Sequence, residues 1–323
     1  SIRLITHRRP EVPELHVADK CWSVEQGSNL LDALNQAGVA VPYSCRAGSC
    51  HACLVRCVQG EPLDLKPQAL ALAQHEQGWR LACQCQVVED LQIEAFDPER
   101  DGLPAQVSAL DWLSPTVLRL RLVTQRPLRY RAGQHVVLWT PGGIARPYSL
   151  ASLPEEDRFL EFHLDCAHPG EFADAARQFK VGELVRLGEL RGGALRYDPD
   201  WQEQPLWLLG AGTGLAPLSG VLREALRQEH QGPIRVVHVA RDDSEFYLAA
   251  ELQALAAEHS NLTVEWVLRS QLADYLPQLR VMARQTHALV CGHPDTVEAF
   301  AKRLFLAGLS RNQLLADRFL TRG

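Results

Sequence analysis

The chain has 323 residues, of which 46% are hydrophobic and 22% are charged, and at about 100–200 residues per domain this length predicts two or three domains. A net charge of -6, from 33 Lys plus Arg and 39 Asp plus Glu, gives no basic surface for phosphate backbones, so nucleic acid is excluded as an expected partner. No apolar run reaches the roughly 18–20 residues of a transmembrane helix, and the first ten residues lack the apolar core of a signal peptide. We therefore expect no transmembrane segment and a cytoplasmic protein.

The nine cysteines are concentrated near the N-terminus. An odd number suits a reduced compartment in which thiolates bind metal better than it suits a disulfide scaffold. Seven of them precede residue 97, namely Cys21, Cys45, Cys50, Cys53, Cys57, Cys83 and Cys85. Residues 98–104 are charged, contain two prolines and one glycine, and predict an exposed linker. We expect the first domain to cover residues 1–97.

Two further domains are predicted after this linker. Between 105 and 200, short alternating segments such as TVLRLRLVT and FLEFHLDC predict an antiparallel sheet or barrel. Between 201 and 323, apolar strands alternate with helices that we expect to begin at Pro217, Ser244 and Asp295. This alternation predicts a parallel sheet with crossover helices.

Four cysteines have a spacing that indicates a metal site. Cys45, Cys50 and Cys53 form C-x4-C-x2-C, and Cys83 follows after 29 residues, which is the ligand spacing of a plant-type [2Fe–2S] cluster. Zinc sites usually repeat a C-x2-C pair, so zinc and buried free thiols are the less favoured alternatives. Cys85 competes with Cys83, because we expect both on the same face of one strand.

Residues 20–94 resemble a plant-type ferredoxin domain, and this resemblance implies that Cys45, Cys50, Cys53 and Cys83 are the cluster ligands. Within this stretch we expect Ser28 to cap a helix that stops near Gly38. Cys21 and Cys57 are interpreted as small buried hydrophobic residues.

The segment RPYSLAS at 146–152 is similar to the R-x-Y-S signature of the ferredoxin–NADP reductase superfamily. The resemblance implies that Tyr148 stacks on the flavin ring, that Ser149 reaches the flavin N5 edge and that Arg146 neutralises a flavin phosphate. Pro147 belongs to the same flavin-binding segment.

Two further glycine-containing segments correspond less closely to this superfamily. Gly170 occupies the phosphate-binding turn, but Ala173 and Asp174 stand where the superfamily places a hydroxyl. FAD is therefore preferred to FMN only because the superfamily uses FAD. Residues 187–193 are expected to form a loop near the adenine half of the flavin.

A glycine-rich turn between a strand and a helix predicts the nicotinamide nucleotide site. Gly210, Gly212 and Gly214 can expose main-chain amides to a pyrophosphate, and Thr213 is a side-chain donor. This segment resembles the G-x-G-T-G-x-x-P form of the same superfamily.

A second segment, VCGHPDTVEAF, resembles the superfamily's C-G-x-P motif and implies that Cys291 and Gly292 lie beside the nicotinamide. We expect the Cys291 thiol to pack against the ring without acting as a nucleophile. A buried cysteine at the end of a strand is the alternative.

Coenzyme choice is expected to depend on residues 239–247. Arg241, Ser244 and Tyr247 suit a 2′-phosphate, whereas Asp242 and Asp243 suit an unphosphorylated ribose, and we favour NADH over NADPH. Near the C-terminus, Phe319 is expected to lie by the flavin, as in oxygenase reductases. An ordinary packed phenylalanine is the equally weighted alternative.

Together these resemblances imply a β-grasp [2Fe–2S] ferredoxin domain, an antiparallel β-barrel flavin domain and a Rossmann-like parallel α/β nicotinamide domain. This order resembles reductase components of the benzoate dioxygenase or soluble methane monooxygenase type. NAD(P)H would then reduce FAD and the cluster, with Ser149, Cys291 and Phe319 beside the reacting rings. The acceptor would be a terminal oxygenase, a hydroxylase, a desaturase or a separate ferredoxin, contacted through Arg46 and His51. An iron–sulfur redox sensor and a subunit of a permanent larger complex are the alternatives.

Overall fold

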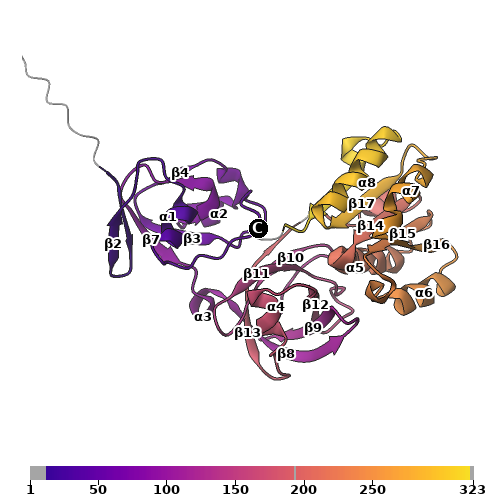
Figure 1. Cartoon of the computed structure of the whole chain (residues 1–323), viewed down its shortest axis with the longest axis horizontal. Helices are drawn as coiled ribbons and strands as arrows, with labels where there is room; N and C mark the ends of the chain where they lie inside the picture. The colour runs from indigo at the N-terminus through magenta and orange to yellow at the C-terminus, as the bar shows by residue number, and fades with distance from the viewer. Residues whose placement is uncertain (1–11, 193, 321–323) are drawn as a thin grey trace, which may run out of the picture. The chain divides into compact units, whose positions relative to one another are not determined.

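The computed structural model describes residues 12–192 and 194–320. Contacts divide the chain into two units, residues 1–101 and 102–323, whose elements are labelled in Figure 1. The division lies within the expected linker. Residues 98–104 nevertheless contain a short helix, α3 (Pro98–Asp101), and the start of strand β8, because Asp97 and Asp101 close a helical turn through a 2.7 Å main-chain hydrogen bond.

The first unit is a five-stranded mixed sheet in the order β2-β1-β7-β3-β5, with a separate β4-β6 pair. Strands β1 and β7 are parallel and the other pairs are antiparallel. Helix α1 packs on the sheet through Leu30, Leu31 and Leu34, all fully buried. The elements are β1 (Glu14–Val17), β2 (Lys20–Ser23), α1 (Leu30–Gln36), β3 (Leu54–Gln59), β4 (Leu63–Asp64), α2 (Leu72–Glu76), β5 (Trp79–Leu81), β6 (Cys85–Gln86) and β7 (Leu91–Ala95).

Helix α1 begins one residue later than its expected cap. The Asn29 side chain accepts a 3.2 Å hydrogen bond from the Asp32 amide, whereas the Ser28 hydroxyl donates to the Glu25 carbonyl. The prediction that Ser28 is the cap was therefore wrong. Gly38 follows the helix with φ +81°, the left-handed conformation that glycine adopts at helix ends.

The second unit begins with a six-stranded antiparallel sheet in the order β11-β10-β13-β8-β9-β12. Its edge strands β11 and β12 also contact each other, so the sheet closes into a barrel around Leu120, Leu138 and Phe162. The elements are β8 (Leu103–Trp112), β9 (Val117–Thr124), β10 (His135–Trp139), β11 (Ala145–Ser149), β12 (Leu160–Asp165), α4 (Glu171–Ala176) and β13 (Leu184–Arg191).

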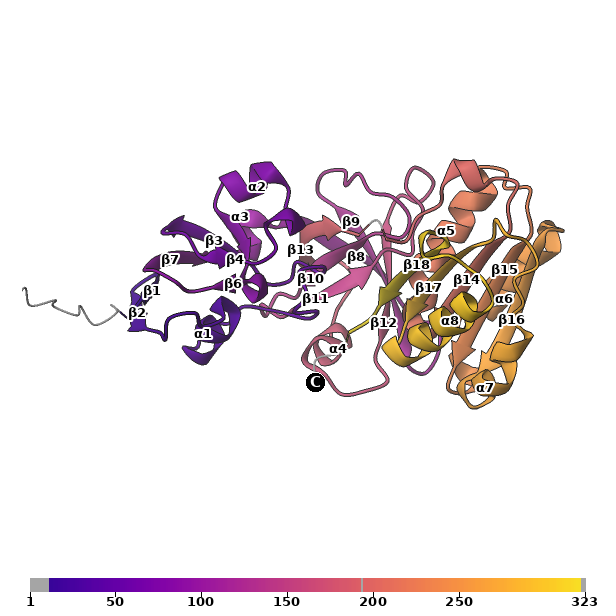
Figure 2. The same cartoon turned by 90° about the horizontal axis from the view of Figure 1, so that it is seen from above.

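The rest of this unit is a five-stranded parallel sheet in the order β16-β15-β14-β17-β18. Helices α5 and α6 bury one face of the sheet, and α7 and α8 bury the other, as Figure 2 shows from above. The elements are β14 (Leu206–Ala211), α5 (Leu215–Arg227), β15 (Ile234–Ala240), α6 (Ala249–Glu258), β16 (Leu262–Leu268), α7 (Leu272–Tyr275), β17 (His287–Gly292), α8 (Pro294–Leu306) and β18 (Leu314–Arg318).

The antiparallel barrel and the parallel sheet with crossover helices confirm the predicted fold classes, and the structure adjusts several boundaries. Helix α5 begins at Leu215, and α6 begins at Ala249 because the preceding residues form a short 3₁₀ turn capped by Asp242. Residues 187–191, expected as a loop, belong to β13, where they pair with β10. Gly193 lies outside the described residues, as do residues 1–11. Among the helices described, none is long and apolar enough to cross a membrane.

Candidate functional site

The four predicted cluster ligands converge in the first unit. Cys45, Cys50 and Cys53 lie on the loop between α1 and β3, and Cys83 lies on a 3₁₀ turn after β5. Cys50, Cys53 and Cys83 are buried and Cys45 is half-buried. Because β3 and β5 are paired strands, the end of β5 brings Cys83 back to the loop.

The four thiols form two pairs. Cys50 donates to Cys45, and this hydrogen bond lowers the pKa of Cys45 to about 3. Cys53 donates to Cys83, and that hydrogen bond lowers the pKa of Cys83 to about 7. Two irons held by two thiolates each would require this arrangement of ligands.

Main-chain amides of the loop point at the sulfur of Cys45. The amide nitrogens of Ala47, Ser49 and Cys50 lie 3.3, 3.4 and 3.4 Å from Cys45 Sγ. The Gln84 side-chain amide lies 3.3 Å from Cys83 Sγ. Such donors stabilise negative charge on thiolate sulfur, so the residues present fit a [2Fe–2S] cluster.

The other cysteines of this unit divide between core and surface. Cys85 lies on β6 and is fully buried in the apolar core. We expected it to share a strand face with Cys83, but Cys83 lies on a 3₁₀ turn formed by residues 82–84, so that expectation was wrong. Cys57 is buried as predicted. Cys21 is exposed on β2, so the prediction that it is a buried hydrophobic residue was wrong.

The two residues expected to contact a partner differ in exposure. Arg46 is exposed and forms a 2.7 Å ion pair with Asp32. His51 is only 5% exposed, because the tight loop turns it inward at a φ of +59°. His51 therefore offers no surface contact, and that part of the prediction was wrong.

The expected flavin segment is strand β11 at the edge of the barrel sheet. Arg146, Pro147 and Tyr148 are half-buried and Ser149 is buried. The Tyr148 ring packs against Phe172 with centroids 4.9 Å apart, which fixes its orientation. Burial raises the pKa of Tyr148, so its phenol stays neutral.

The turn that contains Gly170 has an unusual charge for a phosphate site. Gly170 precedes α4, whose first turn carries Glu171 and Asp174. Arg146 donates to the Ala145 carbonyl at 2.7 Å and to Glu171 at 3.2 Å. The carboxylate on Glu171 thus partly neutralises the arginine predicted to face a flavin phosphate.

The glycine-rich turn connects β14 to α5. A Cβ atom on Gly214 would lie 2.1 Å from the Cys291 carbonyl oxygen, and one on Gly292 would lie 2.2 Å from the Ala211 carbonyl oxygen. Glycine is required at both positions because the ends of β14 and β17 approach so closely. Gly210 also faces Leu215 closely, whereas Gly212 has open space around it and a φ of +57°. Thr213 is half-buried within this turn.

A buried histidine also holds this turn, and no motif in the sequence indicates this role. His238 on β15 is fully buried, and its Nε2 lies 2.9 Å from the Gly212 carbonyl oxygen. Burial lowers the pKa of His238 to about 4, so a neutral imidazole donates this hydrogen bond.

Cys291 lies at the end of β17 and is fully buried. Burial raises the pKa of its thiol, which keeps it protonated and unsuited to nucleophilic attack. In the neighbouring strand, Asp317 is opposite Cys291 in the pairing register, and burial raises the pKa of Asp317 to about 6. Phe319 donates a 2.8 Å main-chain hydrogen bond to Gly292 and packs on the same core.

The residues expected to choose the coenzyme point in different directions. Arg241 lies at the end of β15, where its guanidinium contacts His168 at 3.0 Å and Glu245 at 3.6 Å. The Ser244 hydroxyl donates to Asp242. Tyr247 is 8% exposed and is directed away from this strand end, toward the barrel.

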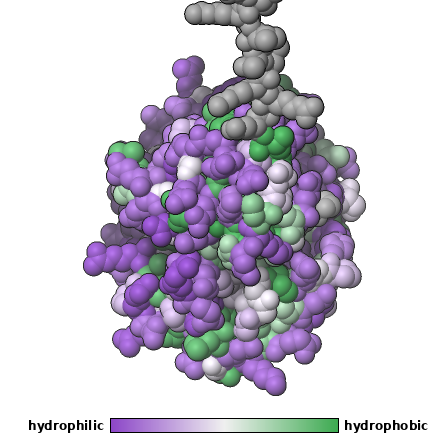
Figure 3. All heavy atoms as spheres, turned by 90° about the vertical axis from the view of Figure 1, so that its left-hand side faces the viewer, coloured by the Kyte–Doolittle hydropathy of each residue, from purple (hydrophilic) through white to green (hydrophobic). Residues whose placement is uncertain are grey.

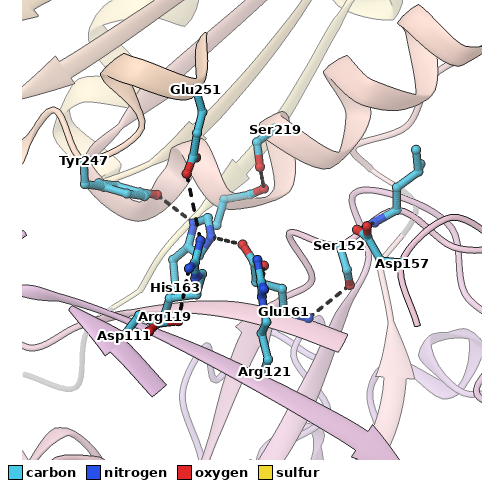
Figure 4. Close-up of polar contacts among 12 residues, drawn as sticks. Asp111, Arg119, Arg121, Ser152, Asp157, Glu161, His163, Ser219, Tyr247 and Glu251 are labelled. Carbon is cyan, nitrogen blue, oxygen red and sulfur yellow. Dashed lines mark hydrogen bonds and ion pairs between the residues drawn. The ribbon is translucent and has the colours of Figure 1, made fainter. Parts of the chain in front are cut away.

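Figure 4 shows where Tyr247 points. Its hydroxyl lies 3.1 Å from His163 Nδ1 on barrel strand β12, and His163 Nε2 lies 2.8 Å from Glu161. Burial alone would raise the pKa of Glu161, but the hydrogen bonds from His163 and Arg121 lower it to about 2. The carboxylate therefore stays charged between two donors.

Two ion pairs also join the barrel to the parallel-sheet domain. Arg223 of α5 contacts Asp157 through two hydrogen bonds of 2.6 and 3.0 Å, and Arg119 of β9 lies 3.9 Å from Glu251 of α6. The side-chain contacts of Figure 4 thus link the barrel, which contains β11, to the domain that contains the glycine-rich turn.

Comparison with known proteins identifies the family. A model of the 2Fe-2S iron-sulfur cluster binding domain matches residues 16–88, and a model of the oxidoreductase NAD-binding domain matches residues 208–302. The reductase component of the naphthalene 1,2-dioxygenase system of Pseudomonas putida is 30% identical, over 92% of this chain and 95% of its own. The chain belongs to the reductase components of oxygenase systems.

Two other relatives agree with this assignment. The reductase component of the naphthalene 1,2-dioxygenase and salicylate 5-hydroxylase systems of a Ralstonia species is 31% identical, over 93% of this chain and 96% of its own. The crystal structure of a cytochrome P450 reductase from Amycolatopsis superposes with a TM-score of 0.64 at 26% identity, over 95% of this chain and 98% of the other.

Membership of this family confirms the predicted activity and cofactors. The reductase is an NAD(P)H-dependent flavin and iron–sulfur oxidoreductase of the ferredoxin–NADP reductase type, and it donates electrons to a partner oxygenase. Its cofactors are a [2Fe–2S] cluster, FAD and a nicotinamide nucleotide.

Proposed function

We propose that the reductase takes a hydride from NADH at the ends of β14 and β17 and delivers single electrons through a cluster held by Cys45, Cys50, Cys53 and Cys83. The convergence of these four cysteines, with main-chain amides 3.3–3.4 Å from Cys45 Sγ, is the observation that carries the proposal. When bound, FAD supplies the conversion of a two-electron donor into one-electron steps.

We assign the flavin ring to the β11 segment. Phe172 packs on Tyr148, and this contact holds the tyrosine ring ready to stack on an isoalloxazine. The Ser149 hydroxyl would donate to the flavin N5 edge. Cys291 is fully buried, so it would support the nicotinamide site from within the core with a neutral thiol, and Phe319 packs on the same core.

NADH is the proposed coenzyme because the side chains that could bind a 2′-phosphate already contact other groups of this chain. Arg241 contacts Glu245 and His168, and Tyr247 is turned toward His163. The acidic side chains of Asp242 and Asp243 disfavour a 2′-phosphate. We expect kcat/KM to be roughly tenfold or more higher for NADH than for NADPH, a difference of about 1.4 kcal/mol.

The acceptor is proposed to be a terminal oxygenase of aromatic compounds or the ferredoxin that serves it. The naphthalene 1,2-dioxygenase system named for two relatives supports this class. Arg46, Ala47 and Ser49 form the exposed part of the cluster loop and would meet the acceptor. We further propose a cytoplasmic location, because the reduced thiols that hold a cluster persist in reducing compartments.

The test is anaerobic mixing of the purified reductase with NADH and, separately, with NADPH. Flavin absorbance reports hydride transfer, and the EPR signal of the reduced cluster reports the next step. Flavin bleaching followed by a cluster signal, faster with NADH, is the expected result. Bleaching without a cluster signal would refute the route through the four cysteines and favour a redox sensor.

Two variants test the roles assigned to the cluster ligands and to Tyr148. Cys53→Ser should abolish reduction of one-electron acceptors such as cytochrome c while flavin reduction persists. Tyr148→Ala should weaken flavin retention, measured as flavin released on dilution. Unchanged cytochrome c reduction in the first variant, or full flavin occupancy in the second, would contradict these roles.

A further inference from the structure

Three metal-binding side chains meet on the outer face of the β1–β2 hairpin, remote in the sheet from the cluster loop. Glu14 and His16 are two residues apart on β1, and Cys21 is the register partner of His16 on β2. Alternation puts these side chains on the face opposite Leu15, which is fully buried. Strand β2 is one edge of the sheet and β5, which leads to Cys83, is the other.

The distances among the three ligand atoms match one face of a metal tetrahedron. Cys21 Sγ lies 3.6 Å from Glu14 Oε2 and 3.7 Å from His16 Nε2, and the last two atoms are 3.5 Å apart. Zinc bonds of about 2.0–2.3 Å give tetrahedral ligand-to-ligand distances of about 3.3–3.8 Å. A zinc ion would therefore need little rearrangement of these side chains.

We propose that Glu14, His16 and Cys21 form a binding site for Zn²⁺ or a similar borderline-soft divalent cation. One thiolate, one imidazole and one carboxylate form a ligand set that suits zinc and not the hard cations Mg²⁺ and Ca²⁺. The thiol of Cys21 loses its proton to solvent as the metal–sulfur bond forms, so no oxidant or reductant takes part.

The surroundings of the hairpin favour a cation and leave it accessible. Asp90 accepts a 2.8 Å hydrogen bond from the Glu14 amide, which adds a negative charge near the site. The side chains of His16 and Glu14 are 43% and 47% exposed, and Cys21 is exposed. The face on which β2 lies is largely hydrophilic in Figure 3. Three protein ligands leave a fourth position for water or another small ligand.

The register of the hairpin supplies the rigidity that the site needs. The four residue pairs from Glu14 with Ser23 to Val17 with Lys20 are antiparallel and unbroken by a bulge. The side chains of directly paired residues lie close together on one face, so the main chain has already brought His16 and Cys21 together.

The test is titration of the reductase, loaded with cluster and flavin, with ZnCl₂ in a calorimeter. One site per chain is expected, and Cys21→Ser, His16→Ala and Glu14→Gln should each weaken it by roughly tenfold or more, since even second-sphere changes cost about 10–100-fold. His259→Ala, at a half-buried histidine at the end of α6 and outside this cluster, is the matched control and should bind zinc like the parent. MgCl₂ should produce no site of comparable affinity.

A second readout identifies the ligands. Co²⁺ in place of Zn²⁺ should give a thiolate charge-transfer band in the difference spectrum, which Cys21→Ser abolishes. Iron content and the EPR signal of the cluster should remain unchanged during the titration. Equal affinity in all variants, or zinc uptake accompanied by loss of the cluster signal, would overturn the proposal.

Discussion

Replacing Gly214 by alanine tests the close approach of β14 and β17 directly. The new Cβ would lie 2.1 Å from the Cys291 carbonyl oxygen, about 0.9 Å inside the 3.0 Å that real Cβ atoms respect. The clash is with main chain, so the end of β17 or the turn itself has to move. Gly214 has a φ of -59°, so alanine can adopt this backbone conformation and the contact alone causes the effect.

A shift of about 1 Å in a reacting geometry costs roughly 100-fold in rate, and overpacking costs about 1–3 kcal/mol of stability. We expect Gly214→Ala to slow flavin reduction by NADH about 100-fold in anaerobic stopped-flow measurements. Gly308→Ala, at the end of α8 and outside the glycine-rich turn, is the matched control, because its Cβ meets nothing within 4 Å and only the left-handed backbone opposes it, at about 1 kcal/mol. Parental rates and melting temperature in Gly214→Ala would refute the reasoning.

Three further outcomes follow from the site. Cys83→Ser should remove the EPR signal and lower the iron content, whereas Cys85→Ser should retain both; the reverse would reassign the fourth ligand. Tyr247→Phe leaves His163 Nδ1 without its hydrogen-bond partner and should lower the free energy of unfolding by about 1 kcal/mol in urea; an unchanged midpoint would contradict the hydrogen bond. Burial raises the pKa of Asp317 to about 6, so ionisation of this side chain destabilises the folded protein as pH rises above the unfolded value near 3.8. Asp317→Asn removes this penalty. The difference in free energy of unfolding between Asp317→Asn and the parent should therefore increase by about 1 kcal/mol between pH 5 and pH 8. A pH-independent difference in unfolding titrations would sink this explanation.

The parts of the site that depend on spacing could be predicted from the sequence. The C-x4-C-x2-C motif places three cysteines on one short loop, and Cys83 needs only one further strand to return to it. The four thiols therefore converge as expected. Strand and helix alternation likewise predicted the parallel sheet. These features depend on periodicity and local chain geometry, which the sequence contains.

Features that depend on tertiary packing were not predictable in this way. Nothing in the sequence indicates that Tyr247 turns toward the barrel or that His238 holds the glycine-rich turn, because each partner is distant in the sequence. The inward turn of His51 results from the local backbone of the loop. Ser28 and Asn29 are both residue types that cap helices, and Asn29 is the cap of α1 because the Ser28 hydroxyl donates to the Glu25 carbonyl instead.

The chain passes from β7, which ends at Ala95, to β8, which begins at Leu103, so a short covalent connection ties the iron–sulfur unit to the flavin unit. Tethered partners meet at an effective concentration in the millimolar range for short connections. Dilution should therefore leave the internal transfer of electrons first-order and unchanged, while delivery to a separate oxygenase slows in proportion to its concentration. The abundance of the acceptor therefore sets the rate of the second step and leaves the first unchanged.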